Sequence, residues 1–115
     1  MPLIALETNV VVDDRKKEQL LEDMSKIVSN VTGKPETYVM ASLTQANIIL
    51  GGDGGEAAFA DVRGIGGMTP GSNQELSEKL CDLLSDSLGI SPARVYINFT
   101  DIPATNWGWN GGTFG

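Results

Sequence analysis

The residue with the sharpest chemical potential is Pro2, which follows the initiating methionine. Methionine is normally removed before a residue as small as proline, and removal leaves a secondary amine at the chain terminus. Such an amine is a useful general base only when its pKa falls toward neutrality, and burial or a nearby cation lowers it. Many proteins begin with Met-Pro without using it. If Met1 is retained, the Pro2 nitrogen is an amide and not a base.

Three polar positions could complete a site around such an amine. Lys34 follows a glycine that ends a predicted helix, where a cation stabilises the helix dipole. That role is the one the sequence favours, and the alternative is that Lys34 binds a substrate carboxylate and lowers the pKa of the Pro2 amine. Tyr96 and Asn98 share one face of a predicted strand, because side chains alternate along a strand. That face is either exposed to solvent or the polar wall of a pocket.

The aromatic residues gather near the C-terminus, although aromatics make up only 6% of the chain. Trp107, Trp109 and Phe114 would ordinarily serve core packing or a contact between subunits. The alternative is that they line a small pocket that accepts an aromatic ligand.

Composition excludes several other functions. Histidine is absent, which removes Ser-His-Asp and Cys-His catalysis and imidazole zinc sites. The only cysteine, Cys81, cannot form an intrachain disulfide, and we expect a buried, inert thiol. We expect neither a metal nor a cofactor. The net charge of −7 argues against a nucleic-acid or anionic-membrane partner, and the basic run 15–17 is typical of a solvated helix face.

Apolar and β-branched residues predict strands at 2–12, 38–49, 57–65 and 94–101. No apolar stretch is long enough to span a membrane, and no secretory signal is recognisable. We therefore expect a cytoplasmic protein.

Two stretches of helical periodicity separate the strands. The first begins after the N-cap candidates Asp13 and Asp14 and stops at Gly33. The second begins with a predicted capping box, Ser72 with Glu75, and ends before Gly89.

The two halves of the chain repeat the order strand, helix, glycine, proline, strand. We predict one domain, 1–115, of two βαβ half-repeats at roughly 2–50 and 57–105, with a C-terminal segment at 106–115. The fold class is α/β (α+β), with a four-stranded mixed sheet and two helices on one face. The other face needs cover from another subunit, and the C-terminal segment could add a strand to a neighbouring chain.

Four separated blocks resemble one family. They are PLIALETNV at 2–10, TGKP at 32–35, ISPARVYINFTD at 90–101 and NWGWNGGTF at 106–114. The chain is similar to macrophage migration inhibitory factor and D-dopachrome tautomerase, of the tautomerase superfamily, over essentially its whole length.

The resemblance implies a homotrimer with active sites between subunits. Pro2 would be the catalytic base. Substrate would bind Lys34 and the backbone around Ile65 in one subunit, and Tyr96 and Asn98 in the next. The remaining implied site residues close the apolar side of the pocket: Trp109 and Phe114.

Two departures from the family pattern stand out. The Cys-x-x-Cys motif of the vertebrate cytokine is replaced by residues 57–60, AAFA, which excludes thiol redox chemistry of that type. Trp107 stands where the cytokine has a smaller aliphatic residue, so we expect a narrower or reshaped pocket mouth.

The function implied by the resemblance is keto–enol tautomerisation of small α-keto acids such as phenylpyruvate, with Lys34 and Asn98 orienting the carboxylate and carbonyl. The alternative is a cytokine-like signalling protein with a vestigial pocket, secreted without a signal peptide and bound by a cell-surface receptor. A purely structural trimer is the third interpretation, disfavoured because the polar set is present together.

Overall fold

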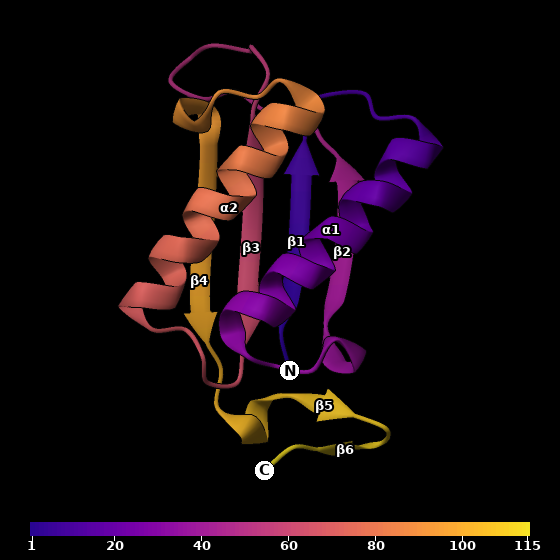
Figure 1. Cartoon of the computed structure of the whole chain (residues 1–115), viewed down its shortest axis with the longest axis vertical. Coiled ribbons are helices and arrows are strands. Elements are labelled where there is room, and N and C mark those ends of the chain that lie inside the picture. Colours follow the sequence, from indigo (N-terminus) through magenta and orange to yellow (C-terminus); the bar gives the residue numbers. More distant parts are fainter.

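The computed structural model describes residues 1–115 as one mixed sheet, two long helices and a small C-terminal hairpin (Figure 1). The strands of the sheet and the two helices are β1 (Leu3–Thr8), α1 (Asp14–Thr32), β2 (Met40–Gln45), β3 (Ala58–Gly64), α2 (Pro70–Leu88) and β4 (Val95–Asp101). Short 3-10 turns precede β2, β4 and the hairpin at Glu36–Tyr38 (η1), Pro92–Arg94 (η2) and Ala104–Asn106 (η3).

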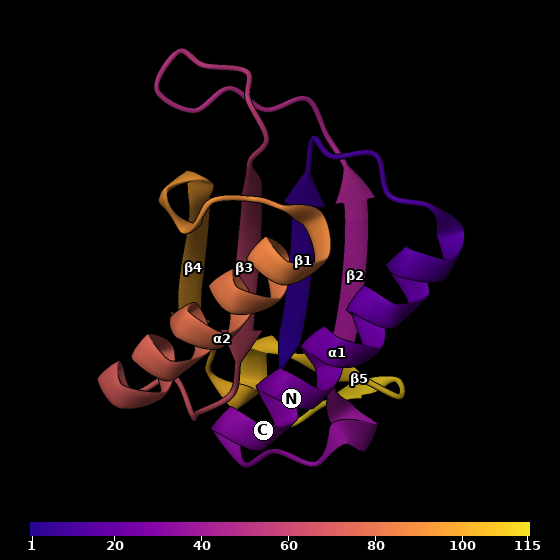
Figure 2. The ribbon, with the colours of Figure 1, turned by 45° about the horizontal axis from the view of Figure 1, so that its top comes forward.

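The sheet has the strand order β2-β1-β3-β4. Each half of the chain forms a parallel pair, β1 with β2 and β3 with β4, and the central β1–β3 pair is antiparallel. Both helices lie on the same face of the sheet (Figure 2). The predicted mixed sheet with two helices on one face is therefore confirmed.

Helix α1 begins and ends where the sequence predicts. The Asp13 side chain accepts a hydrogen bond from the Lys16 backbone nitrogen at 2.9 Å, which satisfies a free donor of the first turn. Gly33 ends the helix with φ 73°, a conformation that glycine adopts without steric cost.

The predicted capping box of α2 is wrong. The helix starts earlier, at Pro70, and its N-cap is Thr69, whose side chain accepts from the Ser72 backbone nitrogen at 3.1 Å. Ser72 returns the bond by accepting from the Thr69 nitrogen at 3.0 Å. Proline suits the first helical position because its φ is already helical and its missing N–H is not needed there, so the start moves ahead of Ser72.

The hydrophobic core fills the space between the helices and the covered face of the sheet. Its buried members are Ile4, Leu6, Met24, Val28, Ala58, Ala60, Val62, Leu76, Leu80, Leu84, Ile90 and Val95. Cys81 packs only against the edge of this cluster and is half-buried, not buried as predicted. Partial burial and the charge of Asp82 raise the pKa of the Cys81 thiol.

The C-terminal segment forms its own hairpin, β5 (Gly108–Trp109) with β6 (Gly112–Thr113). Asn110 and Gly111 make the turn with φ values of 51° and 80°, and two positive values are what a two-residue hairpin turn of matching twist requires. The segment thus pairs first with itself. Figure 1 places this hairpin at the same end of the molecule as the N-terminus.

Candidate active site

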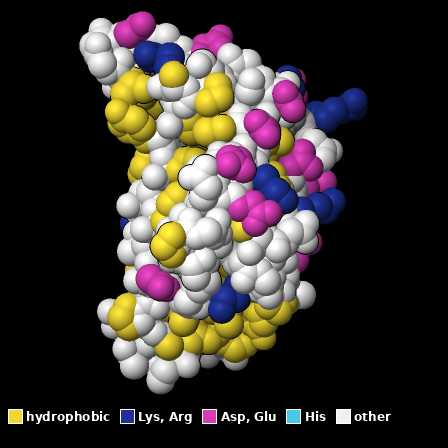
Figure 3. Space-filling model, turned by 60° about the vertical axis from the view of Figure 1, so that its left-hand side comes forward, with side chains coloured by type: hydrophobic (Ala, Val, Ile, Leu, Met, Phe, Trp, Pro, Cys, Tyr) yellow, Lys and Arg dark blue, Asp and Glu magenta, His cyan; other side chains and the backbone are white.

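Pro2 lies at the end of the molecule that carries the C-terminal hairpin. Its side chain is fully buried, and its carbonyl accepts a hydrogen bond from the Met40 nitrogen at 3.0 Å, which ties the start of β1 to β2. Hydrophobic side chains gather over this end in Figure 3, whereas charged side chains cluster over the helices. Burial in an apolar setting is the first condition for a weakly basic amine.

Two cavities flank the N-terminus. The larger has about 430 Å³ and is lined mostly by hydrophobic residues, including Pro2, Trp107 and Trp109. The second has about 390 Å³ and is lined by Met1, Lys34, Pro35, Tyr38, Ile65, Ala104 and Phe114. Met1, Tyr38 and Phe114 line both, so the two cavities adjoin around the start of the chain.

Lys34 is positioned by the end of α1. Ser29 donates from its hydroxyl to the Lys34 carbonyl at 2.6 Å, which holds the backbone just after the helix. The side chain lies over the glycines that follow Ile65: a Cβ on Gly66 would stand 3.7 Å from the Lys34 Nζ. Gly66 has φ 72°, so this close, left-handed turn suits glycine.

The Lys34 ammonium has no ionic partner within the chain, because the ion pairs present involve other lysines and arginines. Its positive charge acts on the pKa of the N-terminal amine. Partial burial first, and then the positive charge of Lys34, lower the pKa of the Met1 amine.

An aromatic wall closes the opposite side of the site. The Trp109 ring stacks on Phe114 at 5.7 Å between centroids and meets the edge of Tyr38 at 6.2 Å. The Phe114 nitrogen donates to the Trp107 carbonyl at 3.1 Å, which joins the two residues that flank the hairpin strands. Such rings form a flat apolar surface suited to a small ligand with an aromatic or aliphatic body.

Sequence reasoning missed Tyr38 as a site residue and assigned it only to a strand. In the structure it belongs to the turn η1, lines both cavities and is 43% exposed. The sequence signal that could have found it is its position, because an aromatic residue shortly after Lys34-Pro35 lies close in the chain to the candidate cation.

Tyr96 and Asn98 line neither of these cavities. They lie on the sheet face that carries no helix, as the alternation along β4 predicts, and Tyr96 is 65% exposed. One chain therefore brings Pro2, Lys34 and Ile65 together with the aromatic wall, and leaves the two β4 residues apart.

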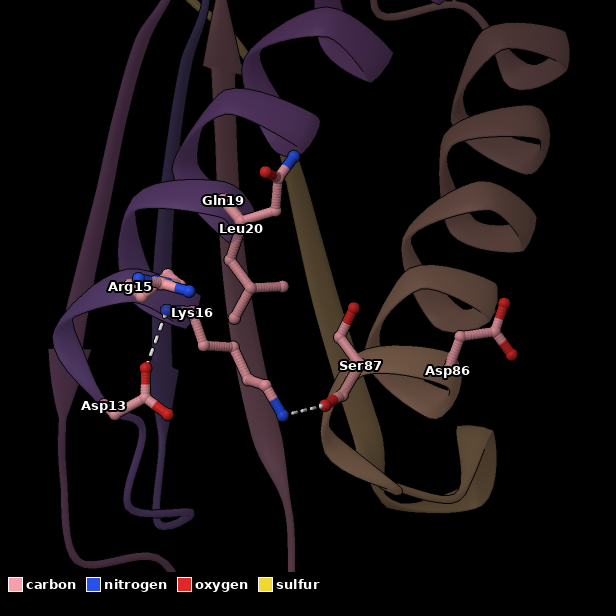
Figure 4. A pocket seen from close by; sticks show the side chains of 7 residues that line it. All are labelled: Asp13, Arg15, Lys16, Gln19, Leu20, Asp86 and Ser87. Carbon is pink, nitrogen blue, oxygen red and sulfur yellow. Dashed lines mark hydrogen bonds between the residues drawn. The ribbon is translucent and has the colours of Figure 1, made fainter.

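A further cavity of about 410 Å³ opens between the start of α1 and the end of α2. Figure 4 shows it rimmed by Asp13, Arg15, Lys16, Gln19 and Asp86, with Leu20 as the only hydrophobic residue. Lys16 donates to the Ser87 carbonyl at 3.1 Å across it, so a cation binds one free carbonyl in the last turn of α2. This is a charged groove between the two helices, and it lies apart from the cavities around the N-terminus.

No group of three or more acidic or cysteine side chains is arranged to hold a metal ion. No helix is long and apolar enough to cross a bilayer.

Comparison with known proteins identifies the family. The family model for macrophage migration inhibitory factor (MIF) matches residues 1–115. A MIF homolog of Trichinella spiralis is 37% identical over 115 residues, 99% of this chain and 100% of that protein. The MIF of Xenopus laevis is 36% identical over 99% of both chains.

A solved structure agrees with these sequence matches. The crystal structure of a MIF homologue from Prochlorococcus marinus superposes with a TM-score of 0.93 at 37% identity, covering 98% of this chain and 99% of that one. This chain therefore aligns with these relatives over essentially its whole length. It carries the buried Pro2, the unpaired Lys34 and the aromatic wall described above. The chain belongs to the macrophage migration inhibitory factor family.

Proposed function

We propose that the chain is a keto–enol tautomerase of small α-keto acids such as phenylpyruvate, with the Pro2 amine as its acid–base catalyst once Met1 is removed. Membership of the family supports a tautomerase-type or cytokine-like function. The substrate and the proline chemistry are the parts that we add. The observation that carries them is that the fully buried Pro2 and the unpaired Lys34 line two adjoining cavities that share an aromatic wall.

The proposed reaction is a proton transfer. The neutral Pro2 amine takes a proton from the carbon next to the keto group, and an enolate forms. The resulting ammonium returns a proton to the oxygen, giving the enol, or to the carbon, giving back the keto acid. Lys34 pairs with the carboxylate, and the apolar wall around Trp109 and Phe114 holds the substrate body.

The pKa direction supports this role. Burial and the Lys34 charge lower the pKa of the terminal amine in the unprocessed chain. After removal of Met1 the terminal amine is that of Pro2, which lies deeper, so the same causes act on it. More of the amine is then in its basic form at neutral pH.

We propose in addition that three copies assemble through the sheet face without helices. Tyr96 and Asn98 lie on that face, so an adjacent chain in such a homotrimer would bring them toward the cavities of its neighbour. The exposed Tyr96 ring and the absence of both residues from the cavities of their own chain support this arrangement.

The test begins with a mass spectrum that confirms loss of Met1. Pro2→Gly should then lower kcat/KM for phenylpyruvate by about 10²- to 10⁴-fold, because the secondary amine in its fixed position is gone. Lys34→Ala should move the rising limb of the kcat/KM profile to higher pH and raise KM, whereas Lys26→Ala on the exposed side of α1 should do neither. Full activity of the Pro2→Gly protein would refute the mechanism.

The second candidate is a cytokine-like protein that binds a cell-surface receptor, and the names of the relatives favour it. Pro2→Gly separates the two functions. A signalling protein with a vestigial pocket would keep receptor binding in this variant and show little turnover in the wild type.

A further inference from the structure

The free face of the sheet carries a closed polar network between β3 and β4. Asp61 and Asn98 are register partners, and the Asn98 Nδ2 donates to Asp61 Oδ1 at 3.1 Å. The same nitrogen donates to Thr100 Oγ1 at 2.6 Å. Arg63 donates from Nε and Nη2 to the other oxygen of Asp61, at 3.0 and 2.8 Å.

This network fixes the orientation of the Asn98 amide. An ionised carboxylate only accepts hydrogen bonds, so the nitrogen of the amide, and not its oxygen, must face Asp61. The amide nitrogen carries two hydrogens, and two acceptors from the same chain take them. What remains for a ligand is the Asn98 carbonyl oxygen, which is an acceptor.

We propose that Asp61 is a positioning residue that, with Thr100, locks Asn98 as a fixed hydrogen-bond acceptor, so that the ligand group meeting Asn98 must be a hydrogen-bond donor. The place of Asn98 in the site rests on the proposed function. A substrate carboxylate or keto oxygen at Asn98 would face an acceptor with the Asp61 carboxylate behind it, and neither offers it a proton. Lys34 therefore takes the carboxylate, and Asn98 selects a hydroxyl.

Arg63 holds the Asp61 carboxylate in place. By occupying Oδ2, it holds the Asp61 carboxylate in one rotamer and balances its charge, and it leaves Oδ1 for Asn98. The Asp61 side chain is only 19% exposed, so water competes weakly for these oxygens. The network joins neighbouring strands and does not depend on a partner chain.

The first experiment measures whether Asp61 and Thr100 hold the Asn98 side-chain amide. In ¹⁵N NMR spectra of the full chain, both side-chain amide hydrogens of Asn98 should exchange slowly with solvent in the wild type. Asp61→Ala and Thr100→Val should each speed the exchange of one hydrogen. Arg63→Met leaves both acceptors present but frees the Asp61 carboxylate to rotate, so it should speed the exchange of the hydrogen that faces Asp61, by less than Asp61→Ala does. Solvent-fast exchange in the wild type, or unchanged exchange in Asp61→Ala, would overturn the proposal.

The second experiment measures the preference of the site for a hydrogen-bond donor over an acceptor on the substrate. It compares kcat/KM for phenylpyruvates that carry a para hydroxyl, a donor, or a para methoxyl, which only accepts. The wild type should favour the hydroxyl by about 2- to 10-fold, the usual worth of one hydrogen bond. In Asp61→Ala the amide can turn, so the ratio should fall toward one while phenylpyruvate turnover persists.

The outcomes of the two arms are distinguishable. A wild type without turnover refutes the proposed function, and the exchange measurement still decides whether Asp61 locks Asn98. A wild type that turns over both substrates, with a ratio that Asp61→Ala leaves unchanged, refutes the selectivity. If Asp61→Ala fails to fold by circular dichroism, Thr100→Val decides by the same two measurements.

Discussion

The two faces of the sheet differ in how far one chain completes them. On the covered face, Ile4 and Leu6 are 0% and 2% exposed under the helices. On the free face, Met40 and Tyr96 are 67% and 65% exposed, although they come from the same four strands. Because side chains alternate along each strand, one face of the sheet carries the buried core residues and the other carries residues that one chain leaves exposed.

The free face of the sheet is part apolar and part polar. Phe59 and Tyr96 are register partners at one end of it. The middle instead carries the Asp61–Arg63 ion pair with Asn98, and Glu7 is exposed beside Phe59. Most donors and acceptors of this network are paired within the chain, which lowers the cost of burying it against a second copy, and the Asn98 carbonyl oxygen stays free for a partner.

The largest expected effect lies on the covered face. Leu80 of α2 is 1% exposed and belongs to the core, so Leu80→Ala should lower the free energy of unfolding by about 2–5 kcal/mol through lost contacts and a cavity. Urea denaturation followed by circular dichroism measures it. Lys79→Ala, on the outer side of the same helix, should stay within about 0.5 kcal/mol. Equal losses of unfolding free energy in the two variants would show that burial between the helices and the sheet does not set the cost.

The next effect tests the free face. Phe59 is 37% exposed there, and Phe59→Asp places a charge where we propose contact between copies. The expected result is at least about tenfold weaker association, seen by sedimentation velocity, with the helical circular dichroism retained. An unchanged assembly would show that this face is not the interface.

A smaller effect concerns the start of α2. Thr69→Ala removes the N-cap acceptor of Ser72 and should cost about 0.5–2 kcal/mol of unfolding free energy. Glu75→Ala should cost no more than about 0.5 kcal/mol, since Glu75 makes only an exposed ion pair with Lys79. The reverse order in thermal or urea melts would favour the capping box predicted from sequence.

The smallest effect is pH dependent. Hydrogen bonds from Arg63, and less from Asn98, lower the pKa of Asp61 in the folded chain. The network therefore stabilises the fold above the ordinary aspartate pKa, about 3.9, and this stabilisation is lost as pH falls through the lowered value. The difference in unfolding free energy between wild type and Asp61→Asn should shrink with acidification below about pH 4. Asp86→Asn is the control, and a difference independent of pH would contradict the assignment.

The sequence by itself determined the two long helices, the four strands of the main sheet and the family. Helical periodicity, the stop at Gly33 and the strand alternation around Tyr96 are local patterns, and each is confirmed. The fold class follows from the same patterns, because two strand–helix–strand halves have few ways to share one sheet. The chemical candidates Pro2 and Lys34 were recognisable by residue type.

Only the tertiary structure decided how distant residues meet. Tyr38 joins Lys34 and Phe114 around the N-terminus because η1 and the C-terminal hairpin reach the same end of the sheet. Asp61 restrains Asn98 because the β3–β4 register sets them side by side. A register between strands depends on packing across the whole sheet, and a shift by one residue would turn each side chain to the other face. No local pattern in the sequence contains that information.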